Sequence, residues 1–487
     1  MSESNDPVLS NSVLSNKVVP NEVAPPRESF WRLVKEALGG SHRDFTKESL
    51  GRAVILLAVP MVVEMVMESI FAIVDIFWVS KLGPDAVAAV GLTESMLTIV
   101  YAAAMGLSMG AAAVVARRTG EGDKEGAARA AVQAIVAGVV IAGLVGLLGA
   151  TFGPRLLVVM GASPATIEVG GNYTRVMLGG SVTVFLLFVI NAIFRGVGDA
   201  TVAMRTLMLA NGINIVLAPF LVFGIGPFPK WGVTGAAVAT TIGRGIGVLY
   251  QLSQLLKGSR RLQVKRIHLR IEAVTLRTIL RISRSGMFQM LIGTASWVAL
   301  VRLLSGYGAE VLAGYTIAVR IVLFALLPSW GMANAATTLV GQNLGAGRPD
   351  RAEAAVWKAS LYNLVFLGTI GLVFVLLARP IVGLFAVEAN VINHGAQALR
   401  IVSLGFLFYA YGMVVPQAFN GAGDTRTPTW LNFFCFWLWE IPLAYLLSRP
   451  LGLGPTGVFT SITVAFCTMT VVSVLVFRRG KWKTVKV

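Results

Sequence analysis

The chain has 487 residues, of which 55% are hydrophobic and 13% are charged, and its formal net charge is +17. Its mean hydropathy is +0.74. Soluble domains carry roughly 25% charged residues, so this composition indicates an integral membrane protein and excludes an ordinary soluble domain.

The segment before the first apolar span is polar and contains several prolines. It has no apolar h-region, so we expect no cleaved signal peptide. Within it, ESFWRLVKEAL (residues 28–38) is compatible with a short amphipathic helix on the membrane surface, although we favour a plain tether. We assign residues 1–49 to a cytoplasmic N-terminal tail.

The first span contains the sequence VVEMVMESIFAIVDIFW (residues 62–78), which carries Glu64, Glu68 and Asp75. Steps of four and eleven residues rotate a helical side chain by roughly 40° and 20°, so the three carboxyls share one face over about 16 Å. An unpaired charge at the bilayer centre costs on the order of 3 kcal/mol. We therefore expect each acid to be protonated, paired, hydrated or ion-bound, with Glu94 of the second span joining the cluster.

Apolar runs long enough to cross a bilayer recur along the chain, and we predict twelve spans in an all-α integral membrane protein. Pro60 lies within the first span and is a hinge candidate, because proline removes a backbone hydrogen bond and can kink a helix. Glu440, in FWLWEIPLAYLL, is a lone acid of the second half. A substrate contact in the cavity and a structural pair are equally good interpretations of Glu440.

An internal repeat appears when the sequence is shifted by 225 residues. The shift pairs Gly83 with Gly308, Gly106 with Gly331, Gly120 with Gly345, Gly122 with Gly347, and FRGVGD with FNGAGD. Each copy holds six spans, so both halves should have the same orientation, related by a pseudo-twofold axis along the membrane normal, with a substrate path between them. We place the N-lobe at residues 50–256, a basic linker at 257–284, the C-lobe at 285–478 and a C-terminal tail at 479–487.

Basic residues alternate between loops as the positive-inside rule requires. With the N-terminus in the cytoplasm, the five inward loops hold 19 Lys and Arg and the six outward loops hold five. The positive charge therefore reflects topology, and we expect no nucleic-acid partner. Since the C-terminal tail is also basic, we expect both termini to be cytoplasmic, in a multi-pass protein of the plasma (inner) membrane.

No catalytic constellation is evident in the sequence. The only Gly-Lys pair is Gly480-Lys481 in the C-terminal tail, so the chain has no P-loop. Three histidines argue against an intramembrane metallohydrolase, and Cys435 and Cys467, both in apolar spans, favour neither a disulfide nor a metal site. We expect that the protein is not an enzyme and needs no cofactor. Uphill transport would be driven by an ion gradient, with the membrane carboxylates binding the ion.

Over residues 50–478 the chain resembles the multidrug and toxic compound extrusion (MATE) transporters. The matching segments are AVPMVVEMVMESIFAIVDIFWVSKLG in the first span, RGVGDA after the fourth, NGINIVLAPFLVFG in the fifth, and LVGQNLGAGRPDRAE and NGAGDTRTP in the second half. The resemblance implies two six-helix lobes, alternating access, and export of amphipathic, mostly cationic compounds in exchange for H⁺ or Na⁺. Small-molecule drugs and the lipid bilayer are then the expected partners of a monomer.

Within this family the chain is similar to the DinF-like branch, whose ion site lies in the N-lobe. Pro60 and Asp75 match the bending proline and the first-span aspartate of that branch. Tyr173, Asn191 and Asn214 match its polar partners in the fourth and fifth spans. If the coupling ion is Na⁺, the resemblance implies that Asp75 and Asn214 help to hold it.

The chain departs from this pattern in its fifth span, where Ala218 replaces the second aspartate of many members. Glu64, Glu68 or Glu94 could supply the missing carboxylate, and Glu64 and Glu68 could instead meet a cationic drug. The acids of the NorM-like C-lobe site are also absent, since the nearest positions that we can align are Gly293 and Tyr409.

Two other classes of function remain open. A lipid or oligosaccharide-lipid flippase on the related fold would be expected to line its cavity with cations for phosphate headgroups, whereas this N-lobe collects acids. A membrane enzyme or receptor is a third class, and the missing catalytic constellation argues against it. We therefore favour an ion-coupled multidrug efflux antiporter.

Overall fold

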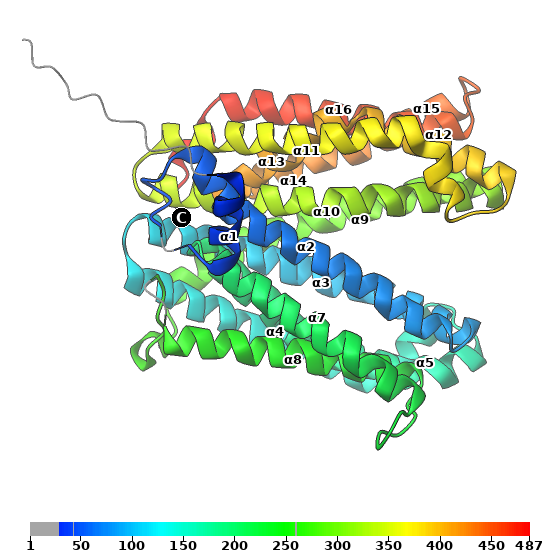
Figure 1. Cartoon of the computed structure of the whole chain (residues 1–487), viewed down its shortest axis with the longest axis horizontal. Helices are drawn as coiled ribbons and strands as arrows, with labels where there is room; N and C mark the ends of the chain where they lie inside the picture. Colours follow the sequence, from blue (N-terminus) through cyan, green and yellow to red (C-terminus); the bar gives the residue numbers. More distant parts are fainter. Residues whose placement is uncertain (1–28, 42, 259–260) are drawn as a thin grey trace, which may run out of the picture.

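The computed structural model describes residues 29–41, 43–258 and 261–487, and all regular elements in these ranges are helical. Ten of the described helices are long and apolar enough to cross a membrane, and α12 (Ala389–Leu404) with α13 (Phe406–Ala422), bent by 58°, can form an eleventh span. The long helices run side by side in a bundle (Figure 1). The all-α membrane fold expected from the sequence is confirmed.

The first half of the chain contains α1 (Phe30–Gly39), α2 (Leu50–Ser80), α3 (Pro84–Gly120), α4 (Lys124–Val159), α5 (Pro164–Gly179), α6 (Ser181–Gly196), α7 (Ala200–Phe223) and α8 (Val233–Lys257). The successive helices α5 and α6 form one span together. Helix α8 is 25 residues long, and polar residues such as Arg244 and Gln251 interrupt its apolar sequence. With α8 as the sixth, the first half has the six spans expected.

The second half contains η1 (Arg266–Leu269), α9 (Ala273–Leu304), η2 (Ser305–Tyr307), α10 (Ala309–Gly345), α11 (Pro349–Gly383), α12, α13, α14 (Arg426–Asn432), η3 (Phe433–Glu440), α15 (Ile441–Ser448), α16 (Pro455–Arg478) and η4 (Lys481–Thr484). Helices α14 and α15 are joined without a break by η3, which has π-helical hydrogen bonding. Residues 426–448 therefore form one span. These elements supply the other six spans.

Repeated glycines lie where the two halves touch. Gly106 of α3 packs on α9, and its repeat partner Gly331 of α10 packs on α2. A Cβ atom added to Gly106 would lie 2.6 Å from the backbone nitrogen of Met287, and one added to Gly331 would lie 2.7 Å from that of Val62. Small residues allow membrane helices to approach this closely. The repeat therefore marks equivalent contacts on the two sides of the interface.

The halves lie in contact on the side that carries the C-terminus, and they diverge toward the opposite side (Figure 1). On the closed side, the Thr338 hydroxyl donates to the Arg195 carbonyl at 3.0 Å, and the Gln342 amide donates to the Gly196 carbonyl at 2.8 Å. Any space between the lobes therefore opens on the side away from the C-terminus.

The described part of the N-terminal tail forms a helix rather than the plain tether that we favoured, and residues 1–28 lie outside the described residues. Helix α1 packs on α2 and α7 with Leu33 and Ala37 buried, and the Thr201 hydroxyl donates to the Ala37 carbonyl at 3.1 Å. The residues after α1 touch both the linker and the second half, since Arg261 of the linker donates to the Arg43 carbonyl and Arg351 of α11 donates to the Phe45 carbonyl. This strap crosses the closed side of the molecule.

Candidate functional site

A central cavity of about 340 Å³ lies between the two halves. Its walls come from α2, α3, α5, α6, α7 and α8 of the first half and from α9, α10 and α13 of the second. All four acids singled out in the sequence, Glu64, Glu68, Asp75 and Glu94, line it. We therefore take this cavity as the candidate site.

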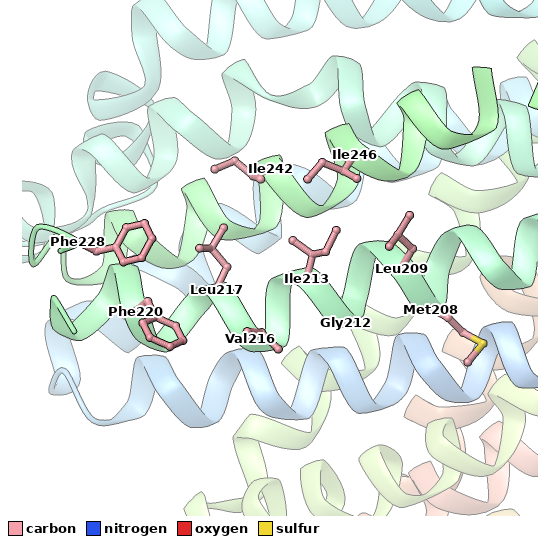
Figure 2. Close-up of a pocket in the computed structure, with 10 residues that line it drawn as sticks. All are labelled: Met208, Leu209, Gly212, Ile213, Val216, Leu217, Phe220, Phe228, Ile242 and Ile246. Carbon is pink, nitrogen blue, oxygen red and sulfur yellow. The ribbon is translucent and has the colours of Figure 1, made fainter. Parts of the chain in front are cut away.

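A second hollow, of about 640 Å³, lies on the outer face of α7 and α8. Figure 2 shows its lining side chains, which are aliphatic or aromatic, with Phe220 and Phe228 at one end and Met208 at the other. Val216 in this groove is 63% exposed. In a membrane-spanning chain such an apolar outer face suits lipid, and its lining side chains offer no group that could couple an ion.

Glu64 anchors a buried polar network at the closed end of the cavity. Its side chain is 1% exposed, and Oε1 accepts hydrogen bonds from Arg195 Nη1 at 2.9 Å and from Asn191 Nδ2 at 3.3 Å. Gln251 of α8 donates to Asn191 Oδ1 at 2.5 Å, which orients the asparagine amide toward Glu64. The network thus joins α2, α6 and α8, and Glu64 is ion-paired.

Arg195 was expected in a loop after the fourth span, but it lies in the last turn of α6 and lines the cavity. Its backbone carbonyl also accepts the hydrogen bond from Thr338 of α10. Arg195 therefore takes part both in the pair with Glu64 and in a contact between the halves, at the point where the cavity ends.

The other cavity acids, Glu68, Asp75 and Glu94, form no ion pair among the described residues. Glu68 accepts a hydrogen bond from Asn211 of α7 at 3.3 Å. Asp75 has one buried oxygen, Oδ1, for which no described residue supplies a hydrogen bond. Glu94 is exposed on α3, and Tyr173 of α5 is buried at 2% exposure; both line the cavity. The cavity therefore contains carboxyl oxygens that are free to take a proton or a cation.

Asn214 lies behind the cavity wall rather than in it. Its side-chain amide donates at 2.8 Å to the hydroxyl of Thr240, and Thr240 lines the cavity. Ala218, one turn further along α7, is fully buried in a small apolar cluster that packs against Trp78. Apolar packing therefore fills the place where many members of the resembled family carry a second aspartate.

Pro60 and Glu440 do not line the cavity. Helix α2 continues through Pro60, which is buried four residues before Glu64. Glu440 is 2% exposed at the end of η3, where Tyr315 and Tyr409 are close enough to interact with it electrostatically. In this conformation Glu440 is an interior residue of the C-lobe, and the geometry offers no contact with a substrate in the cavity.

Arg244 is a cavity residue that was not expected from the sequence. It lies in α8 at 7% exposure, with its guanidinium 5.7 Å from the ring centre of Phe71 and 5.9 Å from that of Tyr101. Its Nη2 donates to the Tyr101 hydroxyl at 3.2 Å. An arginine inside a membrane span is itself a signal of function, so the sequence did contain the hint. With Arg195, it makes the cavity mixed in charge rather than purely acidic.

Both halves of the chain match a known protein family. The family model MatE matches residues 60–220 and 286–446, and the two starting points agree closely with the 225-residue repeat. A probable multidrug resistance protein NorM of Thermotoga maritima is 26% identical over 437 residues, covering 89% of this chain and 93% of the relative. A probable multidrug resistance protein YoeA of Bacillus subtilis is 26% identical over 426 residues, covering 86% and 92%.

Among solved structures, similarity extends to the outward-facing conformation of a multidrug resistance MATE family transporter of the MOP superfamily. The TM-score is 0.84 at 27% sequence identity, and the match covers 89% of this chain and 96% of that chain.

Proposed function

Because the chain belongs to the MatE family of multidrug and toxic compound extrusion transporters, we propose that it exports amphipathic, mostly cationic compounds in exchange for H⁺ or Na⁺. Its relatives are transporters, not enzymes, and two are named as probable multidrug resistance proteins. The observation that carries the proposal is the central cavity, where four acids of α2 and α3 surround a space between two lobes. Intramembrane carboxyls of this kind mark ion and substrate pathways.

Asp75 is the principal ion-coupling residue in this proposal. One of its oxygens is buried without a hydrogen bond from any described residue. A bound ion would satisfy this oxygen, which otherwise carries the cost of a buried acceptor without a partner. Tyr173, Asn191 and Asn214 would complete an N-lobe site of the DinF-like type, with Asn214 acting through Thr240. An ion can shift the lobes between two arrangements only if it binds one arrangement more tightly than the other.

Alternating access would move the N-lobe (50–256) against the C-lobe (285–478), with residues 257–284 as a cytoplasmic linker. The basic loops support a plasma-membrane protein with both termini in the cytoplasm, and we expect it to work as a monomer. In that orientation the cavity opens outward, and the glycine contacts, together with the strap after α1, close the cytoplasmic side.

A lipid or oligosaccharide-lipid flippase is the second candidate. Arg195 and Arg244 favour it, because guanidinium groups bind phosphate. Arg195 is already paired with buried Glu64, however, and Arg244 lies among carboxyls. The acids outnumber the two guanidiniums along this wall, which favours cationic substrates.

Transport by purified protein in liposomes separates these functions. We expect a fluorescent organic cation to move across the membrane when a pH gradient or a Na⁺ gradient is imposed separately, with no movement in protein-free liposomes. Translocation of a labelled phospholipid, without any movement of the organic cation under either gradient, would contradict the antiporter and favour the flippase.

A further inference from the structure

Arg244 is buried in the N-lobe, yet most of its hydrogen-bonding capacity is unused. A guanidinium has five N–H donors. Within the described part of the chain, Tyr101 provides its only hydrogen bond, and the rings of Phe71 and Tyr101 provide its packing. Because Arg244 lines the cavity, its other donors can reach groups in that space.

Acids surround this guanidinium on two helices. On α2, Glu68 and Asp75 lie three residues before and four residues after Phe71, on the face that Arg244 covers. Both carboxyls interact electrostatically with Arg244, and Glu94 of α3 does so as well. None of the three is within ion-pairing distance of Arg244 in this conformation, as far as the described residues show. The guanidinium is therefore close to the carboxyls without being locked to one of them.

Among the described residues, one further cation acts on this cluster: Arg320 of α10 interacts electrostatically with Glu94. Tyr173 of α5 is buried beside the same group and interacts electrostatically with Arg244 and Asp75. Helices α6 and α7 present the neutral amides of Asn191 and Asn214. Arg195, the other guanidinium of the cavity, is paired with Glu64.

This environment suits a proton better than a metal cation. A metal cation needs several oxygen ligands at once, and the carboxylate that would join Asp75 in the resembled site is replaced here by Ala218, which is buried in apolar packing. It would also be repelled by the positive charge of Arg244, because like charges interact strongly where water is scarce. A proton needs only one carboxyl oxygen and adds no charged group beside the guanidinium.

We infer that Arg244 is the resident cation of the ion-coupling site, which makes the site selective for H⁺ over Na⁺. When the Asp75 carboxylate is charged, Arg244 pairs with it; when a proton binds to an Asp75 oxygen, the carboxyl becomes neutral and the guanidinium returns to the Tyr101 hydroxyl and the other carboxyls. This inference rests on the proposed function as an ion-coupled exporter and adds the identity of its coupling ion.

The test compares wild-type protein with Arg244→Gln, which removes the charge, and with Arg244→Lys, which keeps it. Export of a fluorescent organic cation is measured in liposomes under a pH gradient and, at equal pH, under a Na⁺ gradient. We expect a preference for the pH gradient of about tenfold or more in the wild type, because a like charge opposes Na⁺. Arg244→Gln should respond to the Na⁺ gradient and lose most of this preference, whereas Arg244→Lys should keep it.

Thermal unfolding in detergent gives a second measurement that does not depend on transport. Added Na⁺, compared with equal concentrations of choline, should leave the Tm of the wild type unchanged and should raise the Tm of Arg244→Gln. A Na⁺-dependent rise in the wild-type Tm would overturn the inference even if Arg244→Gln failed to fold. Equal driving of the wild type by both gradients, or an unchanged ion preference in folded Arg244→Gln, would also overturn it. If neither gradient drives wild-type export, the proposed function itself is wrong.

Discussion

The ion pair between Glu64 and Arg195 gives a prediction whose size follows from the structure. Glu64→Gln keeps the shape of the side chain and its bond to Asn191, but it removes the charge that lies 2.9 Å from the guanidinium. Removing one partner of a buried ion pair costs roughly 3–5 kcal/mol. Because Arg195 is still 14% exposed to the cavity, we expect the lower end, about 3 kcal/mol of the free energy of unfolding.

Denaturant titration in mixed micelles measures this loss, with Glu168→Gln, an exposed acid of α5, as the control expected to change stability by less than about 0.5 kcal/mol. The double variant Glu64→Gln with Arg195→Gln should be more stable than Glu64→Gln alone, since it leaves no unpaired buried charge. Wild-type stability of Glu64→Gln, or a double variant no more stable than that single variant, would refute the assignment of a structural ion pair at the closed end.

Three further predictions concern topology, the missing aspartate and the contact between the lobes. A single cysteine at Arg266, exposed in η1, should react with an impermeant reagent only in permeabilised cells; labelling of intact cells would contradict the orientation. Ala218→Asp should partly restore transport to Glu68→Gln or Glu94→Gln, and failure to restore either at normal membrane levels would reject the idea that one of them replaces the aspartate. Gly106→Val should open the glycine contact and shift spin-label distances between the lobes, because its Cβ would meet backbone 2.6 Å away; unchanged distances would refute the contact.

Features that depend on one helix could be predicted from the sequence. The acids of α2 share a face because of helical geometry alone, and the structure places Glu64, Glu68 and Asp75 on the same cavity wall. The repeat likewise predicted two equivalent halves, since matched loop motifs do not arise from hydrophobicity alone. The number of spans followed from apolar length, although Arg244 and other polar residues make α8 less apolar than the rest.

Features that depend on several helices packing together could not be predicted in the same way. Arg195 pairs with Glu64 because α6 packs beside α2 at that depth, and no spacing along the chain encodes this contact. The positions of Asn214 behind Thr240 and of Glu440 inside the C-lobe have the same origin. Helix α1 is too short for its pattern to decide between helix and tether, because isolated short helices are marginal in water and need tertiary packing.

Export by Asp75→Asn tests the central claim most directly. Asparagine is a neutral side chain of nearly the same shape, so it keeps the packing of α2 but takes up no proton near neutral pH and has no negative charge with which to hold a cation. The measurement is gradient-driven transport of an organic cation in liposomes, expressed per correctly folded molecule, so that a loss of stability or yield is separated from a loss of coupling. If Asp75 carries the coupling ion, Asp75→Asn protein should insert and fold in the membrane. The organic cation should then move no faster in liposomes that contain this variant than it does in protein-free liposomes. Wild-type rates per folded molecule would contradict the account.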